Sequence, residues 1–267
     1  MSGSGPAPAA GSRLAGRVAL ITGGGGGIGA ATAKLFCAQG ASVMLVDMDA
    51  EALQRTARVI AEEVPGARVE FMAADVADAA AAQKAAGQAQ SAFGQLDVLV
   101  NNAAMRNYSA LADATPEEWH AVLSVNLVGN ANYARASLPF LRKARNGAIV
   151  NVSSCYAVTG RKGMGLYDAT KAGILAMTRT LAFEEAAHGI RVNAVCPGST
   201  LTDFHRKKAE ASGGSVEELK TKRQDTSLLG RWADPMEMAY PILWLASDEA
   251  SFMTGATVMV DGGLSIM

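Results

Sequence analysis

The sequence predicts a single α/β domain built on a doubly wound parallel sheet of about seven strands, with helices on both faces. Short runs of Val, Ile and Leu alternate with longer stretches of helical periodicity, and no linker interrupts them. The chain has 267 residues, of which 49% are hydrophobic and 18% charged, and this is sufficient for a substantial core. Because strands separated by helices are joined by crossovers, we expect neighbouring strands to run parallel.

The elements follow in order along the chain. The expected strands are centred near Val18, Val43, Val69, Val98, Ile149, Val192 and Val258. Helices are expected between them, most clearly at 28–39 and 166–187, where apolar residues recur with helical spacing. Boundary residues support this assignment, because Gly40 follows the first helix, Pro65 and Gly66 the second, and Gly94 the third.

A glycine-rich loop, residues 22–29, follows the first expected strand and leads into the first helix. Strand, glycine turn and helix is the order of a Rossmann-type dinucleotide-binding unit. The glycines let the backbone approach a pyrophosphate, and the helix N-terminus offers free N–H groups. A flexible linker would not be flanked so closely by a strand and a helix, so we interpret the loop as an anion cradle. Its candidate cofactor residues are Thr22, Gly23, Gly27, Ile28 and Gly29.

An acidic residue, Asp47, ends the second expected strand, where this fold places the acid that binds a ribose 2′-hydroxyl. A carboxylate there repels a 2′-phosphate, Met48 follows it, and no Arg or Lys interrupts the glycine loop. NAD is therefore expected rather than NADP. The alternative is that Asp47 only caps the following helix, with Asp49 as an equal candidate.

Tyr167, Lys171 and Ser154 predict an acid/base site. Positions i and i+4 share a helix face, so the Lys171 ammonium lies one turn from the Tyr167 phenol and should lower its pKa from ~10. Ser154 follows the apolar run 148–152, so its hydroxyl should emerge at the carboxyl edge of the sheet, where ligands bind. Proton transfer at an alcohol oxygen is the chemistry that these residues favour.

With these motifs in order, the chain resembles the short-chain dehydrogenase/reductase family from about Gly16 to its end. The loop 22–29 is similar to the family's Thr-Gly-x-x-x-Gly-x-Gly segment, and 101–104 to its Asn-Asn-Ala-Gly segment, although Ala104 replaces the glycine. The segment 197–202 resembles the family's Pro-Gly-x-x-x-Thr motif.

This resemblance implies roles for individual residues. Asn126, Ser154, Tyr167 and Lys171 match the family's catalytic tetrad, in which the asparagine holds a water that links the lysine to solvent. Thr202 matches the residue that touches the nicotinamide carboxamide. The remaining implied cofactor contacts are Asp75 and Val76 at the adenine, with Asn102, Ala103, Tyr167, Lys171, Pro197 and Gly198. Asp168 is unusual, because the family more often has a small residue beside the tyrosine.

The resemblance implies hydride transfer between an alcohol carbon and the nicotinamide. The polar, basic loops and the expected NAD preference lead to the hypothesis that the substrate is a secondary alcohol or hemiacetal, such as a sugar, polyol or ring diol. An anionic group on the substrate is a further hypothesis, since arginine and lysine bind carboxylates, sulfonates and phosphates. The candidate residues are Arg106, Arg161, Lys162, His205 and Arg206. The alternative is that most of them are ordinary solvated charges.

Two other functions stay open. One is a 3-oxoacyl-carrier-protein reductase, which the family also includes, although Asp47 argues against it because that role commonly uses NADPH. The other is a non-catalytic NAD-binding scaffold or regulator, against which the complete tetrad argues. Turnover of any alcohol would separate these functions.

Composition limits the partners and the compartment. A net charge of −1 gives no reason to expect a nucleic-acid partner. The sequence contains no run of eighteen apolar residues, so we expect no membrane span. The three cysteines are too scattered for a disulfide framework, and the three histidines lack metal-ligand spacing, so we expect no metal and a cytoplasmic protein.

The expected organisation is a disordered tail at 1–15 and a catalytic domain at 16–267, with a variable substrate loop at about 199–226. Four large apolar residues precede the last strand, expected at 257–260: Trp244, Leu245, Phe252 and Met253. In the resembling family this region packs against another subunit, which implies a homo-oligomer, commonly a tetramer. The alternative is a purely intramolecular edge strand.

Overall fold

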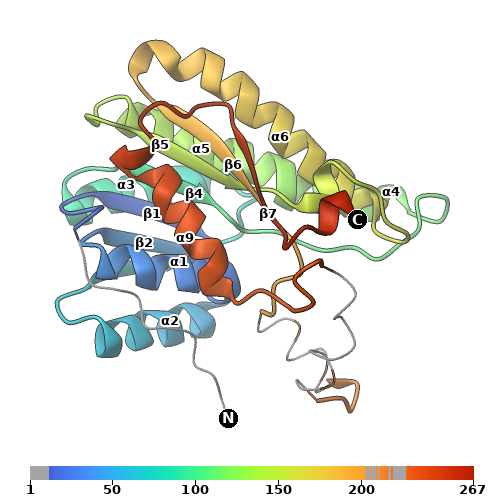
Figure 1. Cartoon of the computed structure of the whole chain (residues 1–267). Helices are drawn as coiled ribbons and strands as arrows, with labels where there is room; N and C mark the ends of the chain where they lie inside the picture. The colour runs from blue at the N-terminus through green and yellow to red at the C-terminus, as the bar shows by residue number, and fades with distance from the viewer. Residues whose placement is uncertain (1–11, 203–204, 206–208, 210, 216–217, 219–226) are drawn as a thin grey trace.

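Seven strands form one parallel sheet in the order β3-β2-β1-β4-β5-β6-β7 (Figure 1). The structure is a computed structural model, and it describes residues 12–202, 205, 209, 211–215, 218 and 227–267. The strands are β1 (Val18–Thr22), β2 (Ser42–Asp47), β3 (Arg68–Ala73), β4 (Val98–Asn101), β5 (Ala148–Val152), β6 (Arg191–Pro197) and β7 (Thr257–Val260). The predicted sheet of about seven parallel strands is confirmed, and each expected strand centre lies in one of them.

The helices connect successive strands. The α-helices are α1 (Gly27–Ala38), α2 (Ala50–Glu63), α3 (Ala79–Phe93), α4 (Pro116–Leu123), α5 (Gly129–Leu141), α6 (Gly165–Glu185) and α9 (Pro235–Ala246). Shorter turns are η1 (Ser124–Val128), η2 (Cys155–Ala157), η3 (Ala186–His188), η4 (Asp248–Ala250) and η5 (Leu264–Ile266). Gly40 and Gly94 end α1 and α3 with positive φ, at +87° and +88°, in agreement with their assignment as boundary residues.

The sheet reverses its winding between β1 and β4. β1 pairs with β2 on one side, where Ile21 is opposite Leu45, and with β4 on the other, where Ile21 is opposite Val100. The connections that follow β1 and β4 therefore leave in opposite directions. In an open α/β sheet, ligands bind beside the carboxyl ends of the two strands at which the winding reverses, here β1 and β4.

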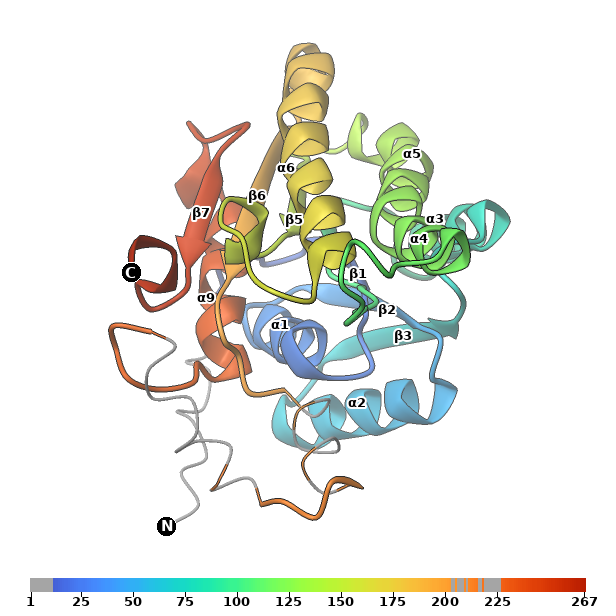
Figure 2. The ribbon, with the colours of Figure 1, turned by 90° about the vertical axis from the view of Figure 1, so that its right-hand side faces the viewer.

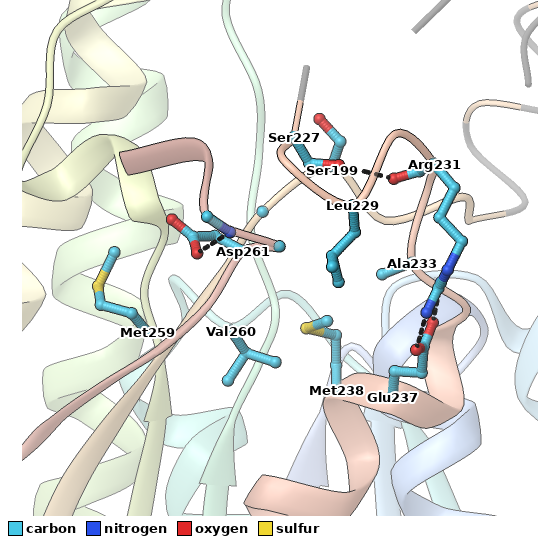
Figure 3. A pocket seen from close by; sticks show the side chains of 13 residues that line it. Ser199, Ser227, Leu229, Arg231, Ala233, Glu237, Met238, Met259, Val260 and Asp261 are labelled. Carbon is cyan, nitrogen blue, oxygen red and sulfur yellow. Dashed lines mark hydrogen bonds and ion pairs between the residues drawn. The ribbon is translucent and has the colours of Figure 1, made fainter. Parts of the chain in front are cut away.

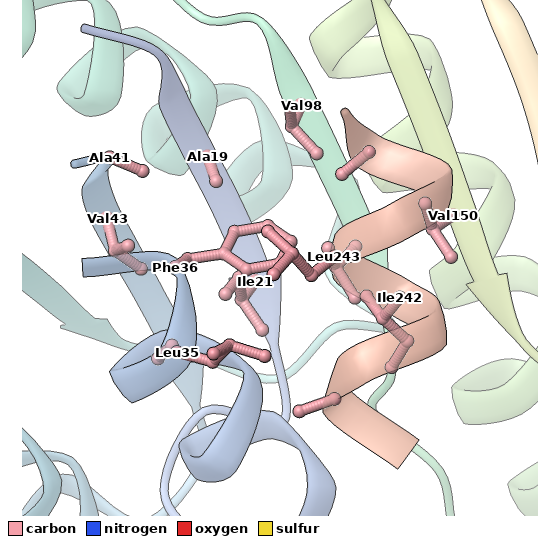
Figure 4. Close-up of a cluster of buried hydrophobic side chains, with 14 of the residues drawn as sticks. Ala19, Ile21, Leu35, Phe36, Ala41, Val43, Val98, Val150, Ile242 and Leu243 are labelled. Atoms are coloured by element: carbon pink, nitrogen blue, oxygen red, sulfur yellow. The ribbon is translucent and has the colours of Figure 1, made fainter. Parts of the chain in front are cut away.

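Helices cover both faces of the sheet (Figure 2). α1, α2 and α9 pack on one face with side chains such as Ile21 and Leu45, whereas α3 and α5 pack on the other face with Leu20 and Met44. In Figure 4, Phe36 of α1 and Leu243 of α9 meet over the central strands. Successive strand residues point to opposite faces, so a strand buried on both sides is an unbroken apolar run.

A buried polar network ties α5 and α6 to the centre of the sheet. Asn101 Nδ2 of β4 donates to Asn130 Oδ1 of α5 at 2.9 Å and to Asn151 Oδ1 of β5 at 3.0 Å. Asn151 Nδ2 donates in turn to Thr178 Oγ1 of α6 at 2.9 Å. Because buried amides are costly to leave unpaired, this network fixes how α6 lies against β5.

The chain near its start is more ordered than the sequence indicated. Residues 1–11 of the expected tail lie outside the described residues, but Leu14 is fully buried in the core, and its N–H donates to Gln39 O at 3.0 Å. Arg13 makes two hydrogen bonds to the carboxylate of Glu249. The expected boundary at residue 15 is therefore too late. Across the described ranges, no helix is both long and apolar enough to cross a membrane.

Candidate active site

A cleft of about 820 Å³ opens at the carboxyl edge of the sheet, beside the ends of β1 and β4. The predicted residues that line it are Gly23, Gly27, Ile28, Asp47, Asn102, Ala103, Arg106, Ser154, Arg161, Tyr167, Lys171, Pro197, Gly198, Thr202 and His205. Six other predicted site residues are described by the structure but do not line this cleft: Thr22, Gly29, Asp75, Val76, Asn126 and Lys162. Arg206 lies outside the described residues. One cleft thus brings the glycine loop and three of the four predicted tetrad residues together.

The glycine loop is shaped by close backbone approaches. A Cβ on Gly23, whose φ is +68°, would lie 2.6 Å from Asn102 Nδ2, and a Cβ on Gly29 would lie 2.0 Å from Gly23 O. Gly27 has a φ of +53° and opens α1. Only glycine fits these positions, so the loop can curl over the amino end of α1 with its backbone exposed to the cleft. That geometry fits the pyrophosphate of a dinucleotide.

Thr22 holds the loop from below instead of lining the cleft. Its Oγ1 accepts the N–H groups of Asn102 at 3.0 Å and Ala103 at 3.1 Å, and Asn102 Nδ2 donates back to Thr22 O at 3.0 Å. Thr22 is 2% exposed. These bonds join the diverging ends of β1 and β4, so Thr22 positions the cleft walls.

Asp47 lies directly under the glycine loop. Its Oδ2 accepts the N–H of Gly25 at 3.0 Å, and its Oδ1 accepts the N–H of Asp49 at 3.1 Å. Asp49 is the N-cap of α2 and accepts from Ala52 N at 2.9 Å, so the alternative in which Asp47 caps that helix is wrong. Arg55 of α2 also lines this end of the cleft, a cation that the sequence argument missed because it considered only the loop.

Tyr167 and Lys171 occupy the first turns of α6, on the face that packs against β5. Lys171 is 1% exposed, and its Nζ donates to Val152 O at 2.7 Å and lies 5.5 Å from the centroid of the Tyr167 ring. Burial lowers the pKa of Lys171 to about 7, and the nearby Arg106 guanidinium acts in the same direction. The lysine therefore carries only part of its charge near neutral pH.

The electrostatic environment of Tyr167 differs from the prediction. Burial raises the pKa of the phenol above its ordinary value; the Arg106 and Arg161 guanidiniums oppose part of this rise, and the Asp168 carboxylate adds to it. The expected lowering by Lys171 is not what the structure shows, because a buried, partly neutral lysine is a weak source of positive potential. Two arginines from other loops partly offset the rise in the pKa of Tyr167. No local spacing in α6 predicts them.

Ser154 lies just beyond β5, where the chain turns into η2. It is the N-cap of that turn, and its Oγ accepts the N–H of Tyr156 at 3.2 Å. The side chain is 5% exposed and lines the cleft together with Tyr167. The predicted emergence of a hydroxyl at the carboxyl edge is confirmed.

Asn126 lies in a π-helical turn, η1, which follows α4 directly. Its Oδ1 accepts from Met105 N at 2.7 Å, and its Nδ2 donates to Met105 O at 2.9 Å and to Thr170 Oγ1 at 3.0 Å. The side chain thus ties the loop after β4 to α6. Single π turns are frequent at functional sites, but no sequence signal used above predicted this one.

The predicted basic residues separate into three environments. Arg106 Nη1 lies 2.8 Å from His205 Nε2, and His205 Nδ1 lies 3.0 Å from Thr202 Oγ1. Trp232 packs edge-on against the His205 ring, with centroids 4.9 Å apart. Arg161 pairs instead with Asp168, at 3.0 Å. Lys162 is exposed and does not line the cleft.

A second cavity of about 290 Å³ adjoins the cleft and shares Gly198 and Ser199 with it (Figure 3). One side carries a two-bond ion pair between Arg231 and Glu237, with N–O distances of 2.7 and 2.6 Å. The other side is the end of β7, where Gly198 N donates to Val260 O at 3.0 Å. This contact holds the Pro197–Gly198 wall of the cleft.

A loop for a pyrophosphate and a tyrosine beside a lysine in one cleft are features of dinucleotide-dependent oxidoreductases. Residues 24–265 match the family model described as enoyl-(acyl carrier protein) reductase. The chain belongs to the short-chain dehydrogenase/reductase family, and it is an enzyme that acts on CH–OH groups with a nicotinamide cofactor.

Relatives cover nearly the whole chain. It is 41% identical to the 3-oxoacyl-[acyl-carrier-protein] reductase of Thermotoga maritima, over 95% of this chain and all of that one. It is 34% identical to the meso-2,3-butanediol dehydrogenase of Serratia marcescens, over 94% and 95%. Among solved structures, the L-sorbose reductase of Gluconobacter frateurii, complexed with NADPH and L-sorbose, superposes with a TM-score of 0.89 at 32% identity, over 97% and 99%.

Proposed function

We propose that the chain is an NAD-dependent oxidoreductase that transfers hydride between the nicotinamide and a secondary alcohol or hemiacetal, such as a sugar, polyol or ring diol. The observation that carries this proposal is the single cleft in which Tyr167, Lys171 and Ser154 face the glycine loop. When bound, the nicotinamide supplies the hydride acceptor or donor. The protein's share of the reaction is to align the substrate and to move a proton.

In this proposal Tyr167 exchanges the hydroxyl proton with the substrate, and Ser154 hydrogen-bonds the same oxygen. Both side chains line the cleft, and the Arg106 and Arg161 guanidiniums favour the phenolate. Lys171, with a pKa of about 7, can take up or release a proton near neutral pH, so it can exchange the proton with Tyr167 as a relay. Asn126 supports the Met105 loop, and a water held beside it would complete the path to solvent.

NAD is the proposed cofactor because the Asp47 carboxylate lies under the loop at the ribose end of the cleft. A 2′-phosphate there would meet this negative charge. Arg55 lines the same end of the cleft, and its positive charge would favour a 2′-phosphate. The structure of the L-sorbose reductase contains NADPH. Both cofactors therefore belong in the assay, with the prediction that NAD gives the higher kcat/KM. The proposed cofactor contacts at Asp75 and Val76 stay predictions, since neither side chain lines the cleft.

The substrate proposal draws on the polar walls of the cleft and on relatives named for a diol and a sugar. The hypothesis of an anionic group on the substrate is tested at Arg106, which lines the cleft beside His205. Arg106→Gln should then raise KM for an anionic alcohol at least tenfold and change KM for a neutral one much less. Equal changes for both substrates would exclude the anion.

A second candidate function is 3-oxoacyl-carrier-protein reduction, favoured by the 41% identity to the Thermotoga maritima enzyme. The deciding experiment incubates the purified protein with NAD or NADP and a panel of neutral and anionic sugars, polyols and cyclic alcohols, and follows the absorbance of the reduced cofactor. Turnover of one alcohol class with NAD supports the main proposal. Silence on the panel, with NADPH-dependent reduction of a 3-oxoacyl thioester, supports the second, and NADH binding without any turnover supports a non-catalytic regulator.

A homo-oligomer, most simply a tetramer, is also proposed. Phe252 is fully exposed after α9, and Phe183 on α6 is 87% exposed. β7 is an edge strand of the sheet, as the intramolecular alternative also requires. Leu245, in contrast, is buried and Trp244 packs against the core, so the apolar surface expected at 244–253 is smaller than the sequence suggested. Light scattering tests the proposal, and a monomeric mass refutes it.

The cytoplasm stays the proposed compartment, supported by three buried free thiols.

A further inference from the structure

A charged pair beside Tyr167 acts on the phenol through its charges and carries no proton in the path described above. Arg161 lies in the loop before α6, and its Nη2 donates to Asp168 Oδ1 at 3.0 Å. Asp168 directly follows Tyr167 in α6, and its side chain is only 11% exposed. Burial raises the pKa of Asp168, while the hydrogen bond and charge of Arg161 oppose that rise. The two groups together present little net charge to the cleft.

Two contacts hold the planar guanidinium of Arg161: the Asp168 carboxylate at its edge and an aromatic ring on its face. Its Cζ lies 3.7 Å from the centroid of the Tyr156 ring, which is a stacked cation–π contact, and 5.4 Å from the centroid of the Tyr167 ring. A planar group held by a ring on one face and a carboxylate at one edge has little freedom to rotate. Its remaining N–H bonds therefore point in fixed directions.

One of these donors is left without an acceptor. Arg161 Nε is buried and has no hydrogen-bond partner among the residues that the structure describes. Nε itself has almost no accessible surface, so a ligand in the cleft would meet the Nη groups, of which Nη2 already donates to Asp168. Arg161, Tyr156, Tyr167 and Ser154 all line the cleft. The Nη donors that Asp168 does not use therefore belong to the same wall as the proposed proton acceptor.

The chemistry of this wall selects a neutral oxygen. The reacting oxygen of the substrate is proposed to bind Tyr167 and Ser154, and the carbon next to the reacting one is the part of the substrate nearest to the adjoining Arg161. An anion there would have to compete with Asp168 for the guanidinium, whereas a hydroxyl or carbonyl oxygen needs only one Nη donor that Asp168 does not use.

We propose that Arg161 is a specificity-determining residue that donates a hydrogen bond to a second, uncharged oxygen on the carbon next to the reacting one, and that Asp168 is the positioning residue that holds it there. The preferred substrates are then vicinal diols and their α-hydroxy ketones. This inference rests on the proposed function, because it places the reacting oxygen at Tyr167.

The test compares 1,2-cyclohexanediol with cyclohexanol, which differ by the second oxygen. Arg161→Gln removes a guanidinium that acts on the pKa of Tyr167, so some loss of kcat/KM is expected for both alcohols. The loss for the diol should exceed the loss for cyclohexanol about 10- to 100-fold, the effect of one hydrogen bond to a charged donor. Arg161→Lys should lose the same preference, because it keeps the charge without the fixed fork. Asp168→Asn should weaken the preference about 3- to 10-fold by loosening Arg161, and the double variant Arg161→Gln/Asp168→Asn should be no worse than Arg161→Gln alone.

Lys162→Gln is the matched control, since it removes a neighbouring exposed charge from the same loop and should leave both substrates unchanged. Thermal melting of each variant separates loss of preference from loss of folding. Equal losses for both substrates in Arg161→Gln, or an unchanged diol preference in Arg161→Lys, would overturn the inference while leaving the proposed function intact. Failure of the unaltered enzyme to oxidise either alcohol, or any other on the panel, would overturn the proposed function and this inference with it.

Discussion

The ammonium group of Lys171 donates a 2.7 Å hydrogen bond to the carbonyl oxygen of Val152, the last residue of β5. The side chain spans from α6 to the sheet and is almost completely removed from water. Burial of a lysine disfavours its charged form, and its pKa accordingly falls to about 7. A residue that suits proton transfer in this way should reduce the stability of the folded protein.

The Lys171→Met variant measures that cost. Between pH 7 and the ordinary lysine pKa of 10.5, the unfolded chain binds a proton at Lys171 that the folded protein does not, so the free energy of unfolding should rise with pH across this window. Lys171→Met removes the dependence. We expect it to be more stable than the unaltered protein near pH 7, by on the order of a few kcal/mol, with the difference shrinking towards pH 10.5. Urea unfolding at both ends of the window tests this, and a pH-independent difference would contradict it.

Removal of the phenol at Tyr167 separates proton transfer from cofactor binding. Tyr167→Phe should lower kcat by about 10²- to 10⁴-fold, the usual contribution of a general acid or base. NADH affinity, measured by fluorescence titration, should change only a few-fold, because the glycine loop stays intact. Normal turnover by this variant would show that the tetrad assignment is wrong.

Asp47 at the end of β2 and Asp49 just after it form a matched pair for cofactor choice. Asp47→Ser should lower kcat/KM for NAD at least tenfold and shift the preference towards NADP, because it removes the carboxylate at the ribose end of the cleft. Asp49→Ser keeps a competent N-cap for α2 and should leave the NAD/NADP ratio unchanged. Steady-state kinetics with both cofactors measures the ratio. If Asp47→Ser keeps the original ratio, another group, such as Arg55, sets the choice.

Two glycines predict opposite effects of the same substitution. In Gly29→Ala the new Cβ would lie 2.0 Å from Gly23 O, so the loop must open, and we expect lost NADH affinity together with a lowered melting temperature. In Gly87→Ala the new Cβ meets nothing within 4 Å inside α3, and helix propensity should raise stability by about 0.5–1 kcal/mol. Calorimetry and NADH titration of both variants provide the comparison. Equal behaviour would mean that the loop tolerates expansion.

The sequence predicted the sheet well for a physical reason. A parallel strand covered on both faces must be apolar throughout, so runs such as 18–21 and 43–46 stand out from their surroundings. The positions of the glycine loop and of Asp47 at the cleft were also predictable, because both are local features whose spacing the backbone geometry dictates. Ser154 was placed correctly from its position after a strand.

The electrostatics of the catalytic end could not be predicted in this way. The groups that oppose the rise in the pKa of Tyr167 are Arg106, from the loop after β4, and Arg161, which a cation–π contact holds on Tyr156. Neither contact leaves a periodic signal. The same limit applies to Asn126, whose two bonds to Met105 span 21 positions, and to the boundary of the tail, where Leu14 inserts into the core. Patterns reveal strands and turns, whereas a potential at one atom depends on every loop that surrounds it.

The placement of Trp232 gives the enzyme its own optical reporter. Its indole is 7% exposed, lines the cleft and packs against His205, whereas Trp119 belongs to α4 and Trp244 to α9. Tryptophan emission overlaps the absorption of reduced nicotinamide, so energy transfer from Trp232 should quench its fluorescence as the cleft fills. Binding of NADH can therefore be followed in real time without a label and without a known substrate.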